Sequence, residues 1–145
     1  HGARGIFFFA EEFARKEKKH WTNLKKLAGE LRCLYPLLSA TGQIDQPDIV
    51  SPILDEKGNP VVHYLAKILT KKTITSSGPE CPLLAEGHYL IAVNTSKKPA
   101  GIRLGKFESA YRYAYDVFTA KKLKFRSGDL RDILEPYGVR IWHLK

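Results

Sequence analysis

From Ser39 onwards, glycine and proline recur at short intervals, and these turn-forming residues constrain the fold more than any other feature of the chain. The runs between them are short and rich in β-branched and aromatic residues, which favour strands. Short strands separated by frequent turns are typical of an antiparallel sandwich. Residues 56–59, Glu-Lys-Gly-Asn, predict a hairpin turn. The predicted strands cover residues 49–54, 61–70, 88–94, 101–104, 110–118, 122–125 and 138–144.

The first 40 residues follow a different pattern. Residues 3–9 form a compact apolar run, which is typical of a strand buried on both faces. After a charged stretch, apolar residues recur at spacings of three and four and predict an amphipathic helix that ends at Pro36. The apolar stripe of this helix consists of Trp21, Leu24, Leu27, Ala28, Leu31 and Leu34.

The sequence therefore predicts a mainly β protein with an N-terminal helix. Residues 1–40 form one strand-helix unit, and residues 41–145 form an antiparallel β-sandwich of about seven strands. The boundary between the two parts falls within residues 36–46.

Size and charge narrow the class of protein. The 145 residues suit one domain or a small domain with an appendage. The chain starts at His1 and contains no Met, so we expect a processed protein or a piece cut from a longer one. Its net charge of +9 would attract a polyanion, so nucleic acid has to be considered as a partner. The basic residues are spread along the chain, however, so we expect a solvated surface and neither nucleic acid nor a membrane as partner.

Cysteine and histidine give no pattern of a metal site or a cofactor site. Cys33 and Cys81 have no second cysteine at metal-ligand spacing, so we expect free thiols, with a disulfide as the alternative. The five histidines form neither HxxxH nor HExxH. Residues 101–105, with one glycine at each end, match neither phosphate-binding fingerprint. We expect no metal and no cofactor.

Carboxylates matter because glycoside hydrolysis uses a pair of them on either side of the scissile bond. Most acidic residues here lie in polar or turn contexts, where they cap and solubilise. Glu11 and Glu12 are the exception because they follow the apolar strand directly, and in a barrel the active site lies at that end of the strand. The other candidates are Asp45, Asp48, Asp55, Glu56, Asp116, Asp129 and Asp132.

Tyrosines at alternate positions are the most specific local signal. Alternation places Tyr111, Tyr113 and Tyr115 on one face of a strand, as either a core face or a platform for sugars or bases. The opposite face carries Arg112 and Asp116, so we expect that face to meet solvent. Residues 94–96, Asn-Thr-Ser, form a glycosylation sequon, which matters only in a secreted eukaryotic protein.

The order of these elements resembles the C-terminal end of a glycoside hydrolase. Residues 1–9, His-Gly-Ala-Arg-Gly-Ile-Phe-Phe-Phe, resemble the eighth strand of a (β/α)8 barrel, and residues 21–31 look like its closing helix. Residues 35–39 look like the exit from that helix. The rest is similar to the β-sandwich that follows many of these barrels, on the evidence of residues 86–96, 115–118 and 128–142. Arg140 and Trp142 stand where that family often has His and Tyr.

The resemblance implies a supporting role for this chain. In such enzymes the catalytic carboxylates come from earlier barrel strands, so no catalytic residue is expected here. Phe8, Phe9 and Glu11 would face the sugar pocket, and the partner would be the remainder of the catalytic barrel. The family also suggests a secreted or periplasmic protein, although no segment of the chain has the pattern of a signal peptide.

Two alternatives remain. One is an autonomous carbohydrate-binding module with Tyr111, Tyr113 and Tyr115 as its platform. The other is a basic nucleic-acid-binding module, which predicts that the lysines form one contiguous face. Those lysines are Lys71, Lys72, Lys97, Lys98, Lys121, Lys122 and Lys124.

Overall fold

The computed structural model describes residues 18–42, 47–50, 52–70, 81–82, 84–105, 107 and 111–145; at residues 18–20, 24 and 49 it describes only the backbone. The first predicted strand, and with it Phe8, Phe9 and Glu11, lies outside the described residues. One helix, α2 (Lys18–Leu38), precedes the strands. The strands are β1 (Asp48–Ile49), β2 (Val62–Leu69), β3 (Gly87–Asn94), β4 (Ala100–Gly105), β5 (Tyr113–Asp116), β6 (Lys122–Lys124), β7 (Leu130–Leu134) and β8 (Val139–Leu144).

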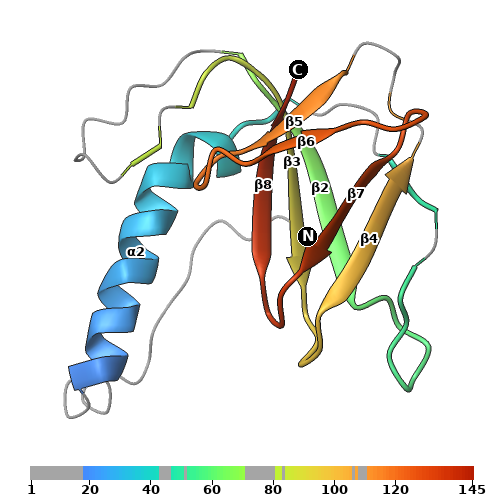
Figure 1. Cartoon of the computed structure of the whole chain (residues 1–145). Helices are drawn as coiled ribbons and strands as arrows, with labels where there is room; N and C mark the ends of the chain where they lie inside the picture. The colour runs from blue at the N-terminus through green and yellow to red at the C-terminus, as the bar shows by residue number, and fades with distance from the viewer. Residues whose placement is uncertain are drawn as a thin grey trace.

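The strands of the described chain form two antiparallel sheets that face each other (Figure 1). The larger sheet has the order β2-β3-β8-β5-β6, and the smaller has the order β1-β4-β7. The predicted fold class, an antiparallel β-sandwich with an N-terminal helix, is confirmed. The predicted turn at 56–59 is also confirmed, since the N–H of Gly58 and the C=O of Asn59 both bond to the backbone of Asp55.

An inter-sheet core joins the two sheets. Alternate residues of each strand point into it, and its centre includes Trp142, Leu90, Leu104 and Leu130, all with no exposed surface. The other face of the larger sheet carries a second core under α2. This helix-side core consists of Leu34, Leu37, Leu69, Leu84, Tyr89, Ile91 and Ile141. The central strands β3 and β8 are therefore covered on both faces.

Strand β7 was not predicted from the sequence. Leu130 and Leu134 point into the inter-sheet core, but the inward position between them is Asp132. A charged residue at an inward position hides the alternation that marks a strand. Only its ionic partners on other elements explain why Asp132 is tolerated there.

The helix continues past the position predicted for its end. Pro36 lies inside α2, which ends at Leu38. Proline removes only its own N–H from the hydrogen-bond ladder of the helix, and the N–H groups that follow it can still donate to carbonyl groups of the preceding turn. Ser39 donates from its backbone N–H to the C=O of Tyr35 at 2.8 Å, and its hydroxyl donates to the same oxygen at 2.7 Å.

Besides the helix-side core, a lysine and a disulfide attach α2 to the rest of the fold. Lys67 on β2 donates from Nζ to the C=O groups of Leu38 and Ala40, at 2.6 and 2.7 Å, and so caps the end of the helix. Burial lowers the pKa of Lys67. A disulfide joins Cys33 on the helix to Cys81 before β3, with 5.3 Å between the two Cα atoms. The expectation of free thiols was wrong, because 48 residues of chain separate two cysteines that the fold brings together.

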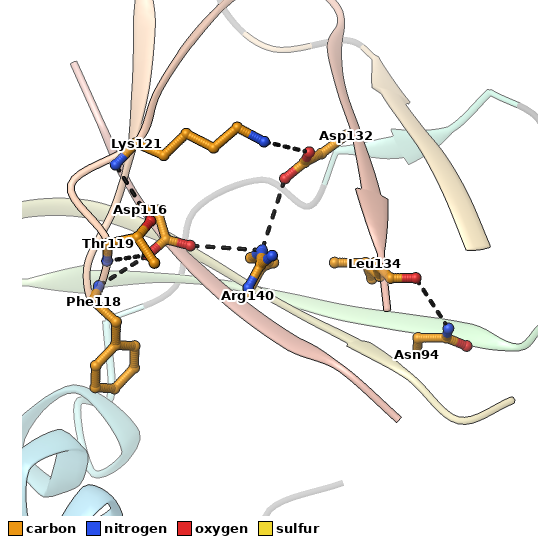
Figure 2. Close-up of polar contacts among 8 residues, drawn as sticks. All are labelled: Asn94, Asp116, Phe118, Thr119, Lys121, Asp132, Leu134 and Arg140. Atoms are coloured by element: carbon orange, nitrogen blue, oxygen red, sulfur yellow. Dashed lines mark hydrogen bonds and ion pairs between the residues drawn. The ribbon is translucent and has the colours of Figure 1, made fainter. Parts of the chain in front are cut away.

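Asn94 ties two turns together at one end of the sandwich, and Figure 2 shows its contact with Leu134. Its side chain is fully buried, and Nδ2 donates to the C=O groups of Lys98, Leu134 and Glu135 at 2.8, 3.3 and 2.9 Å. Its Oδ1 accepts from the backbone N–H and the hydroxyl of Ser96. The sequon asparagine therefore has a structural role in the folded chain and is inaccessible to a glycan.

Asn94→Ala should lower the free energy of unfolding by about 1–3 kcal/mol, because it leaves buried carbonyl groups without a donor. Urea unfolding followed by tryptophan fluorescence measures this loss. The control is Asn59→Ala in an exposed turn, where the amide only reaches Asp55 at 3.4 and 3.5 Å. That variant should stay within about 0.5 kcal/mol of the unmodified protein. Equal losses in the two variants would contradict the role of Asn94.

Candidate functional site

Two carboxylates with buried side chains, those of Asp116 and Asp132, lie close together between the sheets. Asp116 at the end of β5 and Asp132 on β7 lie on either side of Arg140 on β8 (Figure 2). Arg140 Nε lies 3.7 Å from Asp116 Oδ2 and 4.0 Å from Asp132 Oδ2. Lys121 Nζ lies 3.2 Å from Asp132 Oδ1. We call these four residues the inter-sheet ion network.

The ion network balances its own charge. Two carboxylates, with 4% and 8% of their side chains exposed, meet two cations. Asp116 Oδ1 also accepts from the backbone N–H groups of Phe118 and Thr119, at 2.9 and 2.7 Å, and so holds the turn after β5. A buried ionic group is stable only when partners and hydrogen bonds replace its water. The geometry therefore suits a clamp between the sheets, although Asp132 Oδ2 is buried, accepts no hydrogen bond from the described residues, and has its ion pair with Arg140 at the long distance of 4.0 Å.

Two of the other candidate acids, Asp129 and Asp55, are also engaged by groups of the described chain. Asp129 lies between Arg103 and Arg131 on the smaller sheet, with Oδ2 at 2.5 Å from Arg103 Nε and 3.6 Å from Arg131. The hydrogen bond from Arg103 is the main reason that the pKa of Asp129 is lowered. Asp55 accepts from the backbone N–H groups of its own turn, chiefly that of Asn59, and its pKa is lowered for that reason. Glu11, Glu12 and Asp45 lie outside the described residues.

Arg140→Leu should destabilise the fold by about 1–3 kcal/mol, because it leaves two buried carboxylates short of a cation. The matched control is Arg131→Leu, since Asp129 keeps its contact with Arg103 and the Arg131 side chain is 57% exposed. The control should cost less than about 1 kcal/mol. Chemical unfolding of both variants at neutral pH measures the difference. If Arg131→Leu costs as much as Arg140→Leu, the clamp role is wrong.

The tyrosines do not share one face. Tyr113 and Tyr115 are half-buried on the outer face of β5, whereas Tyr111 precedes the strand and packs against the inter-sheet core beside Phe107 and Phe125. The prediction that the Asp116 face meets solvent was wrong. That face carries Ala114 and Asp116 into the sandwich, because the ion network removes the charge penalty.

The two outer tyrosines already have a cation against them. Their ring centroids lie 6.3 Å apart in an edge-to-face arrangement. Lys122 Nζ lies 3.6 Å from the centroid of Tyr113, and Lys145 Nζ lies 5.5 Å from that of Tyr115. A sugar that stacked on Tyr113 from this side would have to displace Lys122.

The lysine groups lie at opposite ends of the larger sheet. Lys122 pairs with Tyr115, which pairs with His143, which pairs with Tyr89 near the start of β3. Lys97 and Lys98 follow the far end of β3, beyond Asn94 (Figure 1). At about 3.4 Å per residue the two groups are about 17 Å or more apart along the strand. The described lysines therefore do not form one contiguous basic face. Lys71 and Lys72 lie outside the described residues, so their place on such a face is not tested.

The pKa of His143 on β8 is lowered from its usual value. Its ring stacks on Tyr89 with 4.6 Å between centroids, and the absence of a side chain at Gly87 makes room for it. A Cβ at Gly87 would lie 2.5 Å from His143 Nε2. Burial is the main cause that lowers the pKa of His143; the charge of Lys145 adds to it, and a backbone hydrogen bond with Glu86 opposes it.

The stability of the protein should therefore fall as the pH falls through the range below about 6.5. As the pH falls, His143 is protonated in the unfolded chain before it is protonated in the folded chain. Acid therefore favours unfolding. Urea midpoints at about pH 7.5 and about pH 5.5 measure the slope. His143→Gln should reduce the slope, because it removes the group that titrates. A slope unaffected by His143→Gln would contradict this assignment.

Two further observations concern the described residues only. They contain no group of three or more His, Cys, Asp or Glu side chains that could hold a metal ion. None of their helices combines the length and apolar character needed to cross a bilayer.

Comparisons with known proteins find only low similarity in sequence and in structure. No protein-family model matches the chain, and no curated protein matches its sequence. An α-amylase from Anoxybacillus is similar over 43% of this chain and 14% of its own, with 17% identity and a TM-score of 0.36. A Bacteroides fragilis protein described as an α-galactosidase is similar over 57% of this chain and 16% of its own, with 15% identity and a TM-score of 0.36. The solved structures that are similar to this chain thus include glycoside hydrolases, at a level that does not define its function.

Proposed function

We propose that this chain is the C-terminal accessory β-sandwich of a glycoside hydrolase, attached to the last helical unit of the catalytic barrel. Its role is to cover and stabilise the barrel, and the chemistry belongs to other strands of the parent protein. The proposal starts from the resemblance of residues 1–9, 21–31 and 128–142 to that family. The observation that carries it further is the uneven burial of α2.

Among the described side chains of α2, those that belong to the helix-side core lie in the second half of the helix. Leu34 and Leu37 belong to the helix-side core, with 8% and 0% of their surface exposed. Leu27, on the same apolar stripe, is 41% exposed, and Ala28 is exposed as well. An apolar stripe that continues beyond its own core supports a second packing partner, since such surface is costly to leave in water.

The sheet beside the helix is covered in the same partial way. Ile91 and Ile141 on the outer face are buried. The neighbouring outward positions away from the helix-side core, Val93 and Val139, have more exposed side chains. Val139 is 51% exposed, and Leu65 across the sheet is 36% exposed. Together with Leu27 these residues form what we call the barrel-facing surface. Its apolar character suits a permanent partner such as the barrel.

The engaged carboxylates fit an accessory role. A glycoside hydrolase needs one acid that can give its proton and one that stays free for the sugar or water. In the described chain Asp116, Asp129 and Asp132 are each held by cations of the same fold. The disulfide between Cys33 and Cys81 is typical of an oxidising compartment and supports a secreted or periplasmic protein.

The chain alone should release no aglycone from a panel of aryl glycosides, whereas the parent enzyme should be active. Hydrolysis by the chain that is lost in Asp116→Asn or Asp132→Asn would overturn the proposal.

Substitutions on the barrel-facing surface should destabilise the parent enzyme but not the isolated chain. Leu27→Asp and Val139→Asp should lower the melting temperature of the parent enzyme by about 2 °C or more, because they place a charge in an apolar contact. In the isolated chain each should change stability by less than about 0.5 kcal/mol. The control is Ile133→Asp on the smaller sheet, which is 61% exposed and faces away from the helix. A parent enzyme insensitive to all three would argue against packing through this surface.

A further inference from the structure

A groove of about 320 Å³ lies between α2 and the turn after β5. Its size is at the lower end for small-ligand sites. One wall is a stretch of the helix, and the other consists of the disulfide loop and an aromatic ring. The residues that line it are Lys25, Lys26, Gly29, Glu30, Arg32, Cys33, Cys81 and Phe118.

The groove carries excess positive charge. Its lining has three cations and one carboxylate, and that carboxylate, Glu30, already has Lys26 at 3.9 Å. Lys25 lies 5.3 Å from the ring centroid of Trp21, so its ammonium group is held near an aromatic face. Arg32 is exposed and forms no ion pair with a carboxylate of the described chain. A guanidinium group without a partner is suited to a carboxylate, which it binds through two parallel hydrogen bonds.

The aromatic wall is held in place by the ion network. Phe118 is 49% exposed, although it is one of the large apolar residues of the chain. Asp116 accepts hydrogen bonds from the backbone N–H groups of Phe118 and Thr119, and Arg140 lies on its other oxygen. Figure 2 shows the Phe118 ring pointing away from the network, on the side of α2. The ring is thus presented by a fixed turn, which lowers the entropy cost of binding a ligand against it.

The groove has one wall segment joined covalently to the helix and an open centre. The disulfide joins Cys33 on the helix to Cys81, so this part of the opposite wall cannot move away from the helix while the two cysteines are bonded. A Cβ built at Gly29 would meet nothing within 4 Å, so the space above the helix at this point is open. A small ligand can therefore lie against the helix backbone between the cations and the ring.

We infer that this groove binds a short anionic saccharide, with its carboxylates on Arg32 and Lys25 and an apolar sugar face on Phe118. The inference rests on the proposed function, which makes a sugar the expected ligand. A nucleic acid fits less well, because the groove is small and the lysines after β3 lie at the other end of the sheet.

The test is calorimetric titration of the complete chain with a short oligogalacturonate, and with a neutral maltooligosaccharide of equal length. Oligogalacturonate should bind, and added salt should weaken it, while the neutral sugar should bind at least about tenfold more weakly. Arg32→Ala and Phe118→Ala should each weaken binding by about tenfold. Gly29→Glu should abolish it by placing a bulky negative charge in the groove. Reduction of the disulfide should weaken binding by releasing one wall.

The matched control compares two double variants with equal loss of charge. Lys25→Ala/Lys26→Ala should weaken binding, while Lys97→Ala/Lys98→Ala, at the far end of the sandwich, should not. Equal weakening by both pairs, equal binding of the neutral sugar, or tighter binding of a single-stranded oligonucleotide would each overturn the inference. Unfolding midpoints of all variants check that the fold is intact. Aryl glycoside turnover measured in the same samples tests the proposed function separately, so the two can fail independently.

Discussion

Strands β3 and β8 at the centre of the larger sheet are apolar on both faces, and the rest of the structure follows from this constraint. Leu90 and Trp142 point toward the smaller sheet, while Tyr89 and Ile141 point toward the helix. Both sets must leave water, so the sheet needs a cover on each side. The smaller sheet provides one cover, and α2 provides the other over part of the opposite face. The apolar surface left uncovered is the physical basis for proposing a further partner.

The two covers are attached by different chemistry. The sheets are joined by packing, with the ion network and Asn94 adding polar ties. The helix is attached by a small core, the lysine cap and the disulfide. A bond that closes a loop of 48 residues removes about 4 kcal/mol of chain entropy from the unfolded state. That contribution suits an element whose own contact area is small, and it fixes the groove beside Phe118 at the same time.

The ion network links stability to the surface of the molecule. Asp116 has one oxygen on Arg140 and the other on the turn that carries Phe118. The same carboxylate that closes the sandwich therefore positions an exposed ring. Removing the network would act on the groove as well as on the fold, which is why the groove is better probed at Arg32 and Gly29.

The antiparallel sandwich, the helix and the turn at 56–59 could be predicted from the sequence, because they depend on local patterns of glycine, proline and apolar residues. The sequence did not reveal β7, since Asp132 interrupts the apolar alternation and its partners Lys121 and Arg140 come from elsewhere in the chain. It also placed the wrong face of β5 in solvent, for the same reason at Asp116. The pairing of Cys33 with Cys81 and the groove between α2 and Phe118 were decided only by the tertiary structure. They depend on distances between distant segments, which local patterns do not encode.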